Sequence, residues 1–588
     1  MNKLLSGNEA IARGAYEAGC EVAAAYPGTP STEILETIAQ YPEIKAEWSI
    51  NEKVALEVAS GASYAGARAL AAMKHVGLNV AADPLFTLSY TGIQGGLVVV
   101  TADDPNLYSS QNEQDNRHYA RSAKLPMLEP SDSDEARRFT ALAFELSEKF
   151  DCPALVRSTT RISHGEGLVE LSERKPGPVS KKAVKDPAKY VMLPGYARPR
   201  HPLVEERMKR LKEFSENFPE NRIEPGDKKI GIISSGVAYQ YAREAFPEAS
   251  FLKLAMVWPL PEKLIHRFAK MVAKLYVVEE LDPFLEENLR AMGLNPIGKD
   301  AFPLCGELSP ELVKKGILGA EAVKKIEFDR TIPERPPNLC AGCPHRGVFY
   351  ALKKLRAFVA GDIGCYTLAA QPPLKSLHTC LCMGAGVGQS FGMEKALGKD
   401  EKIAAVIGDS TFFHSGITPL IDIVYNQGRS TVIILDNLTT AMTGRQGHPG
   451  SGISVYGQPA PRISLEKLGE ALGLRVAVID PFNLEQVEKV LREELAADQP
   501  SLVIARAPCV LLPEFKKIKK SPLRVSEEKC GGCKICLQLA CPAISWVEEA
   551  EPDKKRKGHA RIDPLQCTGC EICMQVCEDH AIWRENEK

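Results

Sequence analysis

The sequence predicts a multidomain α/β protein whose parallel sheets are followed by a small cysteine-rich domain. Three observations lead to this prediction. At 588 residues the chain is several times longer than one hydrophobic core supports, so three to five domains are expected. Short β-branched runs alternate with amphipathic helical stretches, as in βαβ units. Eight of the 17 cysteines lie between Cys530 and Cys577.

The first domain is expected over residues 1–175. A helix is predicted over 8–19 and a buried strand over 20–26, before Pro27 and Gly28. Further strands are predicted at 96–103 and 153–160, with a helix over 136–150 between them. Residues 176–228 are charged and dotted with prolines, which is typical of a linker or crossover segment.

A second, smaller α/β domain is predicted over 229–330, with strands at 229–236 and 274–280. A third is predicted over 335–513, where a strand at 403–409 is followed by a helix over 416–428 and a strand at 431–437. The cysteine-rich domain then occupies 521–588.

Composition excludes several classes of function. Apolar residues make up 44% and charged residues 25%, with a net charge of −2, so neither nucleic acid nor an acidic membrane is expected as a partner. No signal peptide or transmembrane segment is predicted, and the chain is expected in the cytoplasm. Cytosolic thiols stay reduced, so clustered cysteines indicate metal binding rather than disulfides.

The C-terminal cysteines form two C-x2-C-x2-C runs, each followed by a fourth cysteine. Zinc ribbons are the alternative, but zinc does not use this triplet spacing. The runs resemble a bacterial-type ferredoxin domain with two [4Fe–4S] clusters, in which each run takes its fourth ligand from the other. That resemblance implies one cluster on Cys530, Cys533, Cys536 and Cys577, and another on Cys567, Cys570, Cys573 and Cys541. Two departures are the x4 spacing before Cys541 and Glu578 in place of proline.

The third domain carries a pattern similar to the thiamine-diphosphate motif. Gly408–Asp409–Ser410 ends one predicted strand, and after 25 residues Asp436–Asn437 ends the next. Mg²⁺ requires oxygen ligands, which Asp409, Asn437 and the Thr439 carbonyl would supply at the strand ends. Ser410 and Asp436 depart from the usual glycine and asparagine. An aspartate that merely ends a buried strand is the structural alternative.

Two further features belong to this interpretation. The turn at 383–392 opens a helix, and Gly384 and Gly386 are candidates to lie beside the diphosphate. Thiamine chemistry also needs a carboxylate on the aminopyrimidine ring. Glu52 begins a predicted helix, where the helix dipole favours its ionised form, so it is the candidate, with Glu57 as the alternative.

These segments together resemble the 2-oxo acid:ferredoxin oxidoreductases, and above all the α subunits of the indolepyruvate branch. The segments that carry the resemblance include AAYPGTPSTEI, NEKVALEVASGASYAG, LCAGCPHRG, GDIGC and TAMTGRQGHP. The resemblance covers nearly the whole chain. It implies transketolase-like domains: a pyrimidine-binding domain at 1–175, a transketolase C-terminal-like domain at 229–330 and a diphosphate domain at 335–513.

The same resemblance implies an activity. An aryl 2-oxo acid would be decarboxylated oxidatively on thiamine diphosphate, with electrons passing to ferredoxin and the acyl group to coenzyme A. A smaller β subunit would complete an α2β2 enzyme. Thr29 and Ser31 are candidates to face the substrate carboxylate, with turn chemistry as the alternative for Thr29. His378 is a candidate diphosphate contact or, equally, a structural histidine.

Four more cysteines leave a question open. Cys340 and Cys343 form C-x2-C, while Cys365 and Cys509 lie in GIGC and RAPC. Related oxidoreductases hold a cluster near thiamine in similar contexts, so these four either bind a third [4Fe–4S] cluster or are reduced, partly buried thiols.

Three other functions stay as alternatives. The substrate could be pyruvate, 2-oxoglutarate or a branched-chain 2-oxo acid. The chain could be a non-redox thiamine decarboxylase with a ferredoxin tail, or a pure electron-transfer subunit. The eight spaced cysteines argue against the non-redox decarboxylase, and the paired Asp409 and Asn437 argue against the pure electron-transfer subunit.

Overall fold

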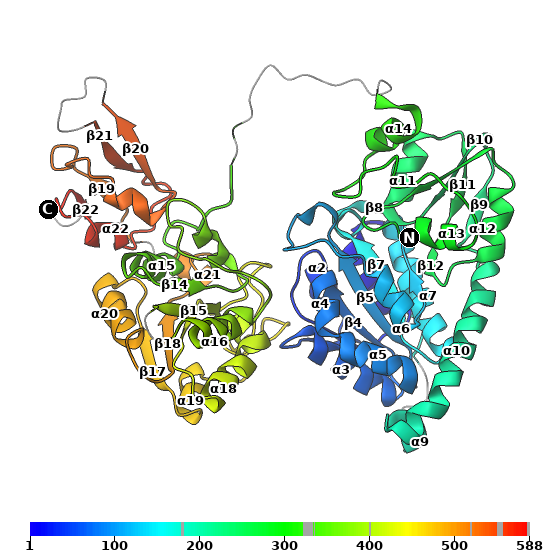
Figure 1. Ribbon diagram of the computed structural model, residues 1–588, viewed down its shortest axis with the longest axis horizontal. Coiled ribbons are helices and arrows are strands. Elements are labelled where there is room, and N and C mark those ends of the chain that lie inside the picture. The colour runs from blue at the N-terminus through cyan, green and yellow to red at the C-terminus, as the bar shows by residue number, and fades with distance from the viewer. Residues whose placement is uncertain are drawn as a thin grey trace. The chain divides into compact units, whose positions relative to one another are not determined.

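The computed structural model describes residues 1–177, 182–320, 333, 335–398, 401–517, 520–549 and 557–584. It divides into two compact units, Met1–Asp329 and Arg330–Lys588, which are described separately (Figure 1). In the part of the chain that is described, no helix has the length and apolar character needed to cross a bilayer.

The first unit is built on a seven-stranded sheet in the order β12-β6-β7-β5-β4-β2-β3. All neighbouring strands are parallel except β12, which is antiparallel to β6 at one edge. The strands are β2 (Val22–Ala25), β3 (Lys45–Trp48), β4 (Ala69–Lys74), β5 (Leu97–Asp103), β6 (Met127–Leu128), β7 (Ala154–Thr159) and β12 (Met256–Trp258). The central strand β5 is buried along its whole length, as expected for a parallel sheet covered on both faces.

The helices of this sheet begin at the polar residues that the sequence provides. Ser6 and Glu9 form a capping box at the start of α1, and Asp132 caps α7. The elements are α1 (Gly7–Glu17), α2 (Thr32–Ile38), α3 (Glu52–Tyr64), α4 (His75–Val80), α5 (Ala82–Thr91), a 3₁₀ turn (Pro105–Leu107), α6 (Arg117–Ala123), α7 (Ser133–Phe150) and α8 (Thr160–His164). An antiparallel pair, β1 (Asn2–Ser6) and β8 (Glu166–Glu170), lies beside them.

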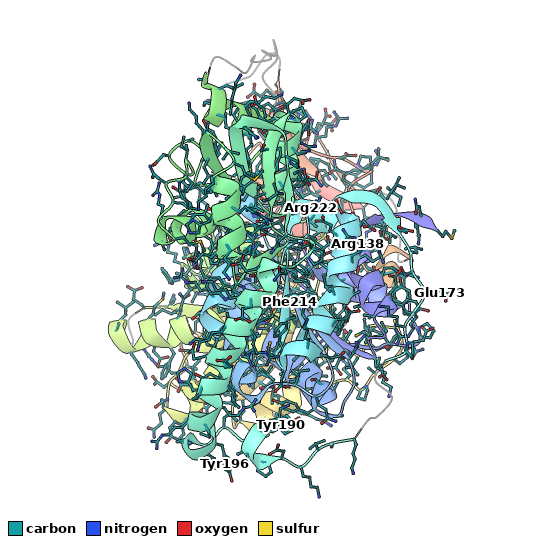
Figure 2. The ribbon with its side chains drawn as sticks, turned by 90° about the vertical axis from the view of Figure 1, so that its right-hand side faces the viewer. Arg138, Glu173, Tyr190, Tyr196, Phe214 and Arg222 are labelled. Atoms are coloured by element: carbon teal, nitrogen blue, oxygen red, sulfur yellow. The ribbon has the colours of Figure 1, made fainter. Side chains whose placement is uncertain are left out.

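The predicted linker segment contains a long helix. It holds α9 (Pro187–Tyr190), the 23-residue α10 (Pro194–Glu216) and β9 (Arg222–Glu224). Pro199 and Pro202 lie in the first half of α10, and this is why the sequence reads as irregular. Figure 2 labels Phe214 near the end of α10. The Phe214 ring packs edge-on against Phe150 of the first domain, with ring centroids 5.5 Å apart, and so anchors α10 to the end of α7.

A four-stranded sheet, β13-β10-β11-β9, completes the first unit. Only β9 runs antiparallel to its neighbour. The other strands of this sheet are β10 (Asp227–Ser234), β11 (Ala249–Lys253) and β13 (Lys274–Val278). The helices of the same region are α11 (Gly236–Ala245), α12 (Glu262–Ala269), α13 (Phe284–Ala291) and α14 (Pro310–Leu318). Because β12 of the seven-stranded sheet follows β11, the two sheets are tied by the chain itself.

The second unit contains a parallel five-stranded sheet in the order β14-β15-β16-β18-β17. Apolar side chains cover both of its faces. The strands are β14 (Phe358–Ala360), β15 (Ile403–Gly408), β16 (Thr431–Asp436), β17 (Arg475–Ile479) and β18 (Ser501–Arg506). The helices are α15 (His345–Lys354), a 3₁₀ helix (Cys365–Ala370), α16 (Ala385–Leu397), α17 (Asp409–Thr411), a π-helical turn (Phe412–Gly416), α18 (Ile417–Tyr425), α19 (Leu465–Ala471), α20 (Leu484–Glu494) and α21 (Pro513–Lys517).

The cysteine-rich region of this unit has two antiparallel strand pairs. They are β19 (Leu523–Val525) with β22 (Ile582–Arg584), and β20 (Ile544–Glu548) with β21 (Gly558–Ile562). A 3₁₀ helix (Ile535–Leu539) contains the last cysteine of the first run, Cys536, and α22 (Ile572–Gln575) contains the last of the second, Cys573. This arrangement is consistent with the ferredoxin domain that the sequence predicts.

Candidate functional site

Asp409 lies buried at the carboxyl end of β15, as the sequence predicts for a strand-end ligand. Its Oδ1 accepts a hydrogen bond from the Ser410 backbone N–H at 2.8 Å. Its Oδ2 accepts one from the Leu438 N–H at 2.8 Å and lies 3.1 Å from Nε2 of His448. Burial opposes the ionised form, but the His448 charge and these hydrogen bonds hold the pKa of Asp409 below its usual value.

The end of β16 brings a second group of oxygen atoms to the same place. Asp436 is buried, and burial followed by the charge of Asp409 raises its pKa to about 6. Asn437 is 7% exposed, and its Nδ2 lies 3.4 Å from Nε2 of the buried His345. Thr439 donates its N–H to Oδ1 of Asn437 at 3.2 Å. Two buried carboxylates and an amide therefore gather where parallel strands end.

The glycine-rich turn is held by a residue that the sequence did not single out. Asp362, fully buried after β14, accepts hydrogen bonds from the backbone N–H groups of Gly384 and Gly386, both at 2.9 Å. Burial raises its pKa to about 6 although these hydrogen bonds oppose the rise. The backbone amides of Gly384 and Gly386 thus donate to a carboxylate of this chain. The sequence offered a signal, because Gly361–Asp362 repeats the Gly408–Asp409 pattern after a strand.

His378 has structural contacts at the edge of the sheet. Its Nδ1 accepts a hydrogen bond from the Val359 N–H at 2.9 Å, and its ring stacks on Phe358 with centroids 5.0 Å apart. The side chain is exposed. These contacts explain the histidine without a cofactor, and its role at the diphosphate stays a prediction.

In the first unit, Glu52 begins α3 and is 4% exposed. The cap is Asn51, whose Oδ1 accepts from the Val54 N–H at 2.9 Å. Glu52 lies against α4 so closely that a Cβ on Gly77 would be 2.6 Å from its Oε1. The alternative, Glu57, is exposed and pairs with Lys53. The structure therefore presents Glu52 as the buried carboxylate of this helix start.

Lys74 is a neighbour of Glu52 that the sequence did not reveal. Burial lowers its pKa to about 8, against the opposing charges of Asp104 and Glu52. Its Nζ donates to the Ser109 carbonyl at 3.0 Å, and its side chain covers Gly28. A cation therefore lies between the Glu52 helix and the loop at 27–31.

The loop at 27–31 is held by its own hydrogen bonds. Ser31 is 2% exposed, and its Oγ donates to the Gly28 carbonyl at 2.8 Å. The carbonyl of Thr29 accepts from Oγ of Ser109 at 3.1 Å. The Ser31 hydroxyl thus stabilises the turn, and the roles of Thr29 and Ser31 in binding the substrate carboxylate stay predictions.

The eight tail cysteines lie in two sets of four. One pocket is lined by Cys530, Cys533, Cys536 and Cys577, and another by Cys541, Cys567, Cys570 and Cys573. Burial, and then the thiols of Cys533, Cys530 and Cys577, raise the pKa of Cys536 to about 11. This grouping is the one that the ferredoxin resemblance implies.

The extra residue before Cys541 is absorbed by local helix rather than by a strand bulge. The 3₁₀ helix Ile535–Leu539 ends at Ala540, which has a φ of +56°. The N–H of Ala540 donates to the Leu537 carbonyl at 3.0 Å. Cys541 therefore still reaches the pocket of the second run.

The other four cysteines converge as well. Burial raises the pKa of Cys365 to about 11, with the neighbouring thiols of Cys509 and Cys340 adding to the rise. Burial likewise raises the pKa of Cys343 to about 12, and Cys340 and Cys365 add to it. The N–H of Cys509 donates to the Asn437 carbonyl at 3.0 Å, so this set adjoins the Asp409 group.

Comparison with known proteins identifies the family. Residues 13–224 match the model described as pyruvate flavodoxin/ferredoxin oxidoreductase, thiamine diP-binding, and residues 362–505 match the C-terminal TPP-binding domain of thiamine pyrophosphate enzymes. The indolepyruvate oxidoreductase subunit IorA of Archaeoglobus fulgidus is 43% identical, covering 92% of this chain and 92% of that one. IorA of Pyrococcus abyssi is 42% identical, covering 94% and 93%. The chain belongs to the IorA family of indolepyruvate oxidoreductase subunits.

This IorA-family chain is thus an oxidoreductase subunit of the 2-oxo acid:ferredoxin class with thiamine-diphosphate-binding domains in both units. The 2-oxoglutarate synthase subunit KorA of A. fulgidus is 27% identical and covers 48% of this chain and 88% of its own length. The fold class and family predicted from the sequence are confirmed.

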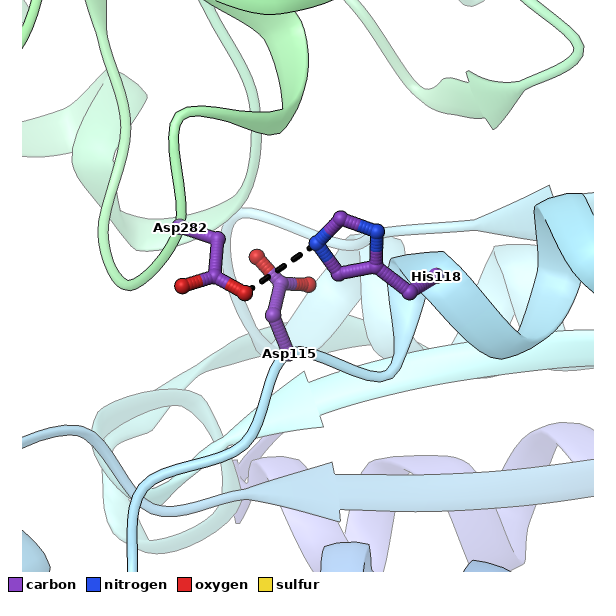
Figure 3. A group of neighbouring side chains, drawn as sticks. All are labelled: Asp115, His118 and Asp282. Carbon is purple, nitrogen blue, oxygen red and sulfur yellow. Dashed lines mark hydrogen bonds and ion pairs between the residues drawn. The ribbon is translucent and has the colours of Figure 1, made fainter.

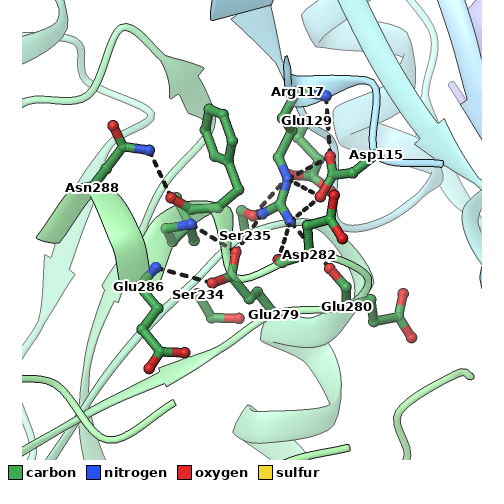
Figure 4. Close-up of polar contacts among 12 residues, drawn as sticks. Asp115, Arg117, Glu129, Ser234, Ser235, Glu279, Glu280, Asp282, Glu286 and Asn288 are labelled. Carbon is green, nitrogen blue, oxygen red and sulfur yellow. Dashed lines mark hydrogen bonds and ion pairs between the residues drawn. The ribbon is translucent and has the colours of Figure 1, made fainter. Parts of the chain in front are cut away.

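The IorA-family chain also contains a buried charge network in its first unit (Figure 4). The guanidinium of Arg117 contacts both carboxylate oxygens of Asp115, and its Nη1 donates to Oε2 of Glu279 at 2.7 Å. It also donates to the carbonyls of Glu280 and Asp282, each at 3.1 Å. The network joins the two sheets of the first unit, so its role is structural.

One group beside this network has metal-like geometry. Asp115, His118 and Asp282 bring one ligand atom each within 4.8 Å of the others (Figure 3). Both oxygens of Asp115 are already bonded to Arg117, so a metal ion there would face a guanidinium charge. We assign no metal site to these residues.

Proposed function

We propose that this chain catalyses the coenzyme-A-dependent oxidative decarboxylation of aryl 2-oxo acids, with indolepyruvate as the representative substrate and ferredoxin as the electron acceptor. The observation that carries the proposal is the gathering, in one unit, of buried oxygen ligands at the ends of β15 and β16 with four cysteines beside them. A non-redox decarboxylase needs only the first group.

The oxygen ligands fit Mg²⁺ and a diphosphate. Asp409 and Asp436 are buried together, and Oδ1 of Asp436 has no hydrogen-bond partner among the described residues. His448 pairs with Asp409 and Arg506 with Asp436, and the carboxylate oxygens that remain are hard donors of the kind that suits Mg²⁺. Asp409, Asn437 and the Thr439 carbonyl would hold the ion, while Ser410, Gly408 and the turn at Gly384 and Gly386 would border the diphosphate. Bound thiamine diphosphate supplies the carbanion chemistry that decarboxylation needs.

Glu52 would hold the proton exchanged with the aminopyrimidine ring. It lies buried at the start of α3, and its burial would make a hydrogen bond to a ring nitrogen strong. The nearby Lys74 and Thr29 would donate to the substrate carboxylate, and Ser31 would do so by releasing the Gly28 carbonyl.

Three [4Fe–4S] clusters are the most economical assignment of the cysteines. Twelve cysteines form three sets of four, and in each set burial raises the pKa of at least one thiol. Such thiols ionise readily only when they bind metal. The clusters would carry electrons singly from the substrate to ferredoxin.

The substrate class and the partners follow from the relatives. Both IorA relatives are named as subunits of indolepyruvate oxidoreductase and are 42–43% identical over most of their length. We therefore propose a smaller β subunit in an α2β2 enzyme of the cytoplasm. A preference for pyruvate, 2-oxoglutarate or branched-chain acids is the competing outcome.

The test is an anaerobic purification with the β subunit, in which iron, acid-labile sulfide and thiamine are counted per chain. We expect about twelve irons from three four-iron clusters, and reduction of ferredoxin only when indolepyruvate and coenzyme A are both present. A Cys343→Ser variant should lose the iron of one cluster alone. Release of CO2 without an acceptor would instead support the non-redox enzyme, and absence of thiamine would leave an electron-transfer subunit.

The role of Glu52 has its own matched control. Glu52→Gln should lower the rate of ferredoxin reduction by about 10²–10⁴-fold, because an amide cannot exchange the proton. Glu57→Gln makes the same change on the exposed face of the same helix and should leave the rate unchanged. Equal rates in the two variants would contradict the assignment.

A further inference from the structure

Two buried hydrogen-bond donors lie at the pocket of Cys541, Cys567, Cys570 and Cys573 without a partner. Nε of Arg346 and Oγ1 of Thr568 are both buried and have no hydrogen-bond partner among the described residues. Both residues line this pocket, and Arg346 is 1% exposed. A buried donor without an acceptor is unfavourable, so each points to an acceptor that occupies the pocket.

The rest of the Arg346 guanidinium is held rigidly by backbone. Nη1 donates to the Leu539 carbonyl, and Nη2 donates to the carbonyls of Leu339 and Cys340 at 3.0 and 2.9 Å. Among the described residues no carboxylate forms an ion pair with it. A buried guanidinium without a counter-charge is unfavourable, so a negatively charged group is expected next to it.

Arg346 lies close to two different cysteine sets. Burial raises the pKa of Cys343 and of Cys570, and in both cases the Arg346 charge opposes that rise. The loops of the two sets also touch. Gly342 has a φ of +71°, and a Cβ on it would lie 2.1 Å from Oγ1 of Thr568. The loop at 340–343 and the loop at 567–570 are therefore packed against each other.

The pocket of the other tail set has a different environment. Cys530, Cys533, Cys536 and Cys577 share it with Lys534 and Asp579, both of which are exposed. The carboxylate of Asp579 accepts from the Gly531 N–H at 2.9 Å. Solvent screens these charges, whereas the charge of Arg346 is buried.

We propose that Nε of Arg346 and the hydroxyl of Thr568 donate hydrogen bonds to the sulfur atoms of the iron–sulfur cluster held by Cys541, Cys567, Cys570 and Cys573. They raise its reduction potential above that of the cluster on the other tail set. Uptake of an electron makes the cluster more negative, and a buried cation with two hydrogen bonds stabilises that form. This inference rests on the proposed function, which supplies both the clusters and the electrons.

The test is a redox titration of the complex of this chain with its β subunit, followed by electron paramagnetic resonance. Thr568→Val keeps the shape of the side chain and removes the donor, and we expect the reduction equilibrium of one cluster to weaken by up to tenfold, which is 59 mV for one electron. Arg346→Gln should lower the same midpoint further, and Arg346→Lys, which keeps the charge, should lower it less. Lys534→Gln is the control variant, because it removes a charge beside the other tail set, and it should leave this midpoint unchanged.

The outcomes separate the inference from the proposed function. Unchanged midpoints in both Thr568→Val and Arg346→Gln would overturn the inference, because the two donors would then be bonded to ordered water rather than to the cluster. If Arg346→Gln fails to fold, Thr568→Val alone decides. A wild-type complex without iron would sink the proposed function and the inference with it, whereas intact clusters with unmoved midpoints sink the inference alone.

Discussion

The two units bury carboxylates in opposite ways. In the first unit, Asp103, Asp115, Glu129 and Glu279 are matched by the guanidinium groups of Arg117 and Arg157, both almost fully buried. In the second unit, Asp362 accepts from backbone N–H groups, and Asp409 accepts from backbone N–H groups and pairs with His448. Asp436 pairs with the partly exposed Arg506 through one oxygen, and its other oxygen has no hydrogen-bond partner among the described residues.

The difference teaches how a structural network is told from a binding site. Burial and shifted pKa values occur in both units, since burial raises the pKa of Asp103 to about 7 and that of Asp436 to about 6. What separates them is the kind of partner. Each carboxylate of the first network contacts a guanidinium group that is almost fully buried, whereas in the second unit Asp436 pairs with the partly exposed Arg506 and Asp362 accepts from backbone N–H groups.

The largest expected effect comes from Asp409→Asn. Because the variant loses a charged Mg²⁺ ligand, thiamine diphosphate should no longer bind, and ferredoxin reduction should fall by at least about 100-fold. Without cofactor the variant chain should lose only a modest part of its stability, because the amide gives up the ion pair with His448 but can still accept a backbone hydrogen bond. Retained thiamine and the thermal unfolding midpoint measure the two effects.

The matched control is Asp422→Asn on α18, which makes the same change on an exposed side chain of the same domain. It should keep its thiamine and its activity. If Asp409→Asn lowers the unfolding midpoint as strongly as it lowers activity, the carboxylate is structural and the contrast between the units is wrong.

A smaller effect, on stability rather than chemistry, is expected from Arg157→Met. Nε of Arg157 donates to Asp103 at 2.7 Å, and its Nη1 contacts Glu129. Loss of the guanidinium leaves both carboxylates buried and unpaired, and the free energy of unfolding should fall by about 3–5 kcal/mol. Denaturant unfolding measures the loss, and hydrogen exchange of β5 and β7 should locate it.

Arg161→Met is the control for this variant, because Arg161 is mostly exposed and pairs with Glu307. Its loss should change stability by less than about 1 kcal/mol. Equal losses in the two variants would mean that the buried network contributes no more than a surface ion pair.

Much of this arrangement could be predicted from the sequence, and the parts that could not have physical reasons. Asp409 and Asn437 were found because each follows a long β-branched strand. Asp362 was missed because β14 has only three residues, too few for a periodic pattern.

Contacts that span long stretches of chain leave no local signal. Arg117 and Glu279 are 162 residues apart, so nothing near either residue indicates the pair. The helix α10 was hidden by Pro199 and Pro202, and tertiary contacts such as that of Phe214 with Phe150 offset their low helix propensity. The grouping of the eight tail cysteines was predicted through their resemblance to a bacterial-type ferredoxin domain, in which each C-x2-C-x2-C run takes its fourth ligand from the other.

The smallest effect is a pH dependence at the edge of the first network. Glu280 is buried, and burial together with the charges of Glu307 and Glu129 raises its pKa to about 7. Between the unfolded pKa of 4.5 and about 7 the folded state holds a proton that the unfolded state releases, so stability falls as pH rises. Glu280→Gln should therefore match the wild type near pH 5 and exceed it by roughly 1–3 kcal/mol at pH 8. The amide oxygen of the variant can still accept the hydrogen bond from the Leu308 N–H, which is 2.9 Å long in the wild type.

Unfolding midpoints across this pH range, with the exposed Glu244→Gln as control, measure the difference. Parallel profiles for wild type and Glu280→Gln would show instead that the charge of Arg157 offsets the burial of Glu280.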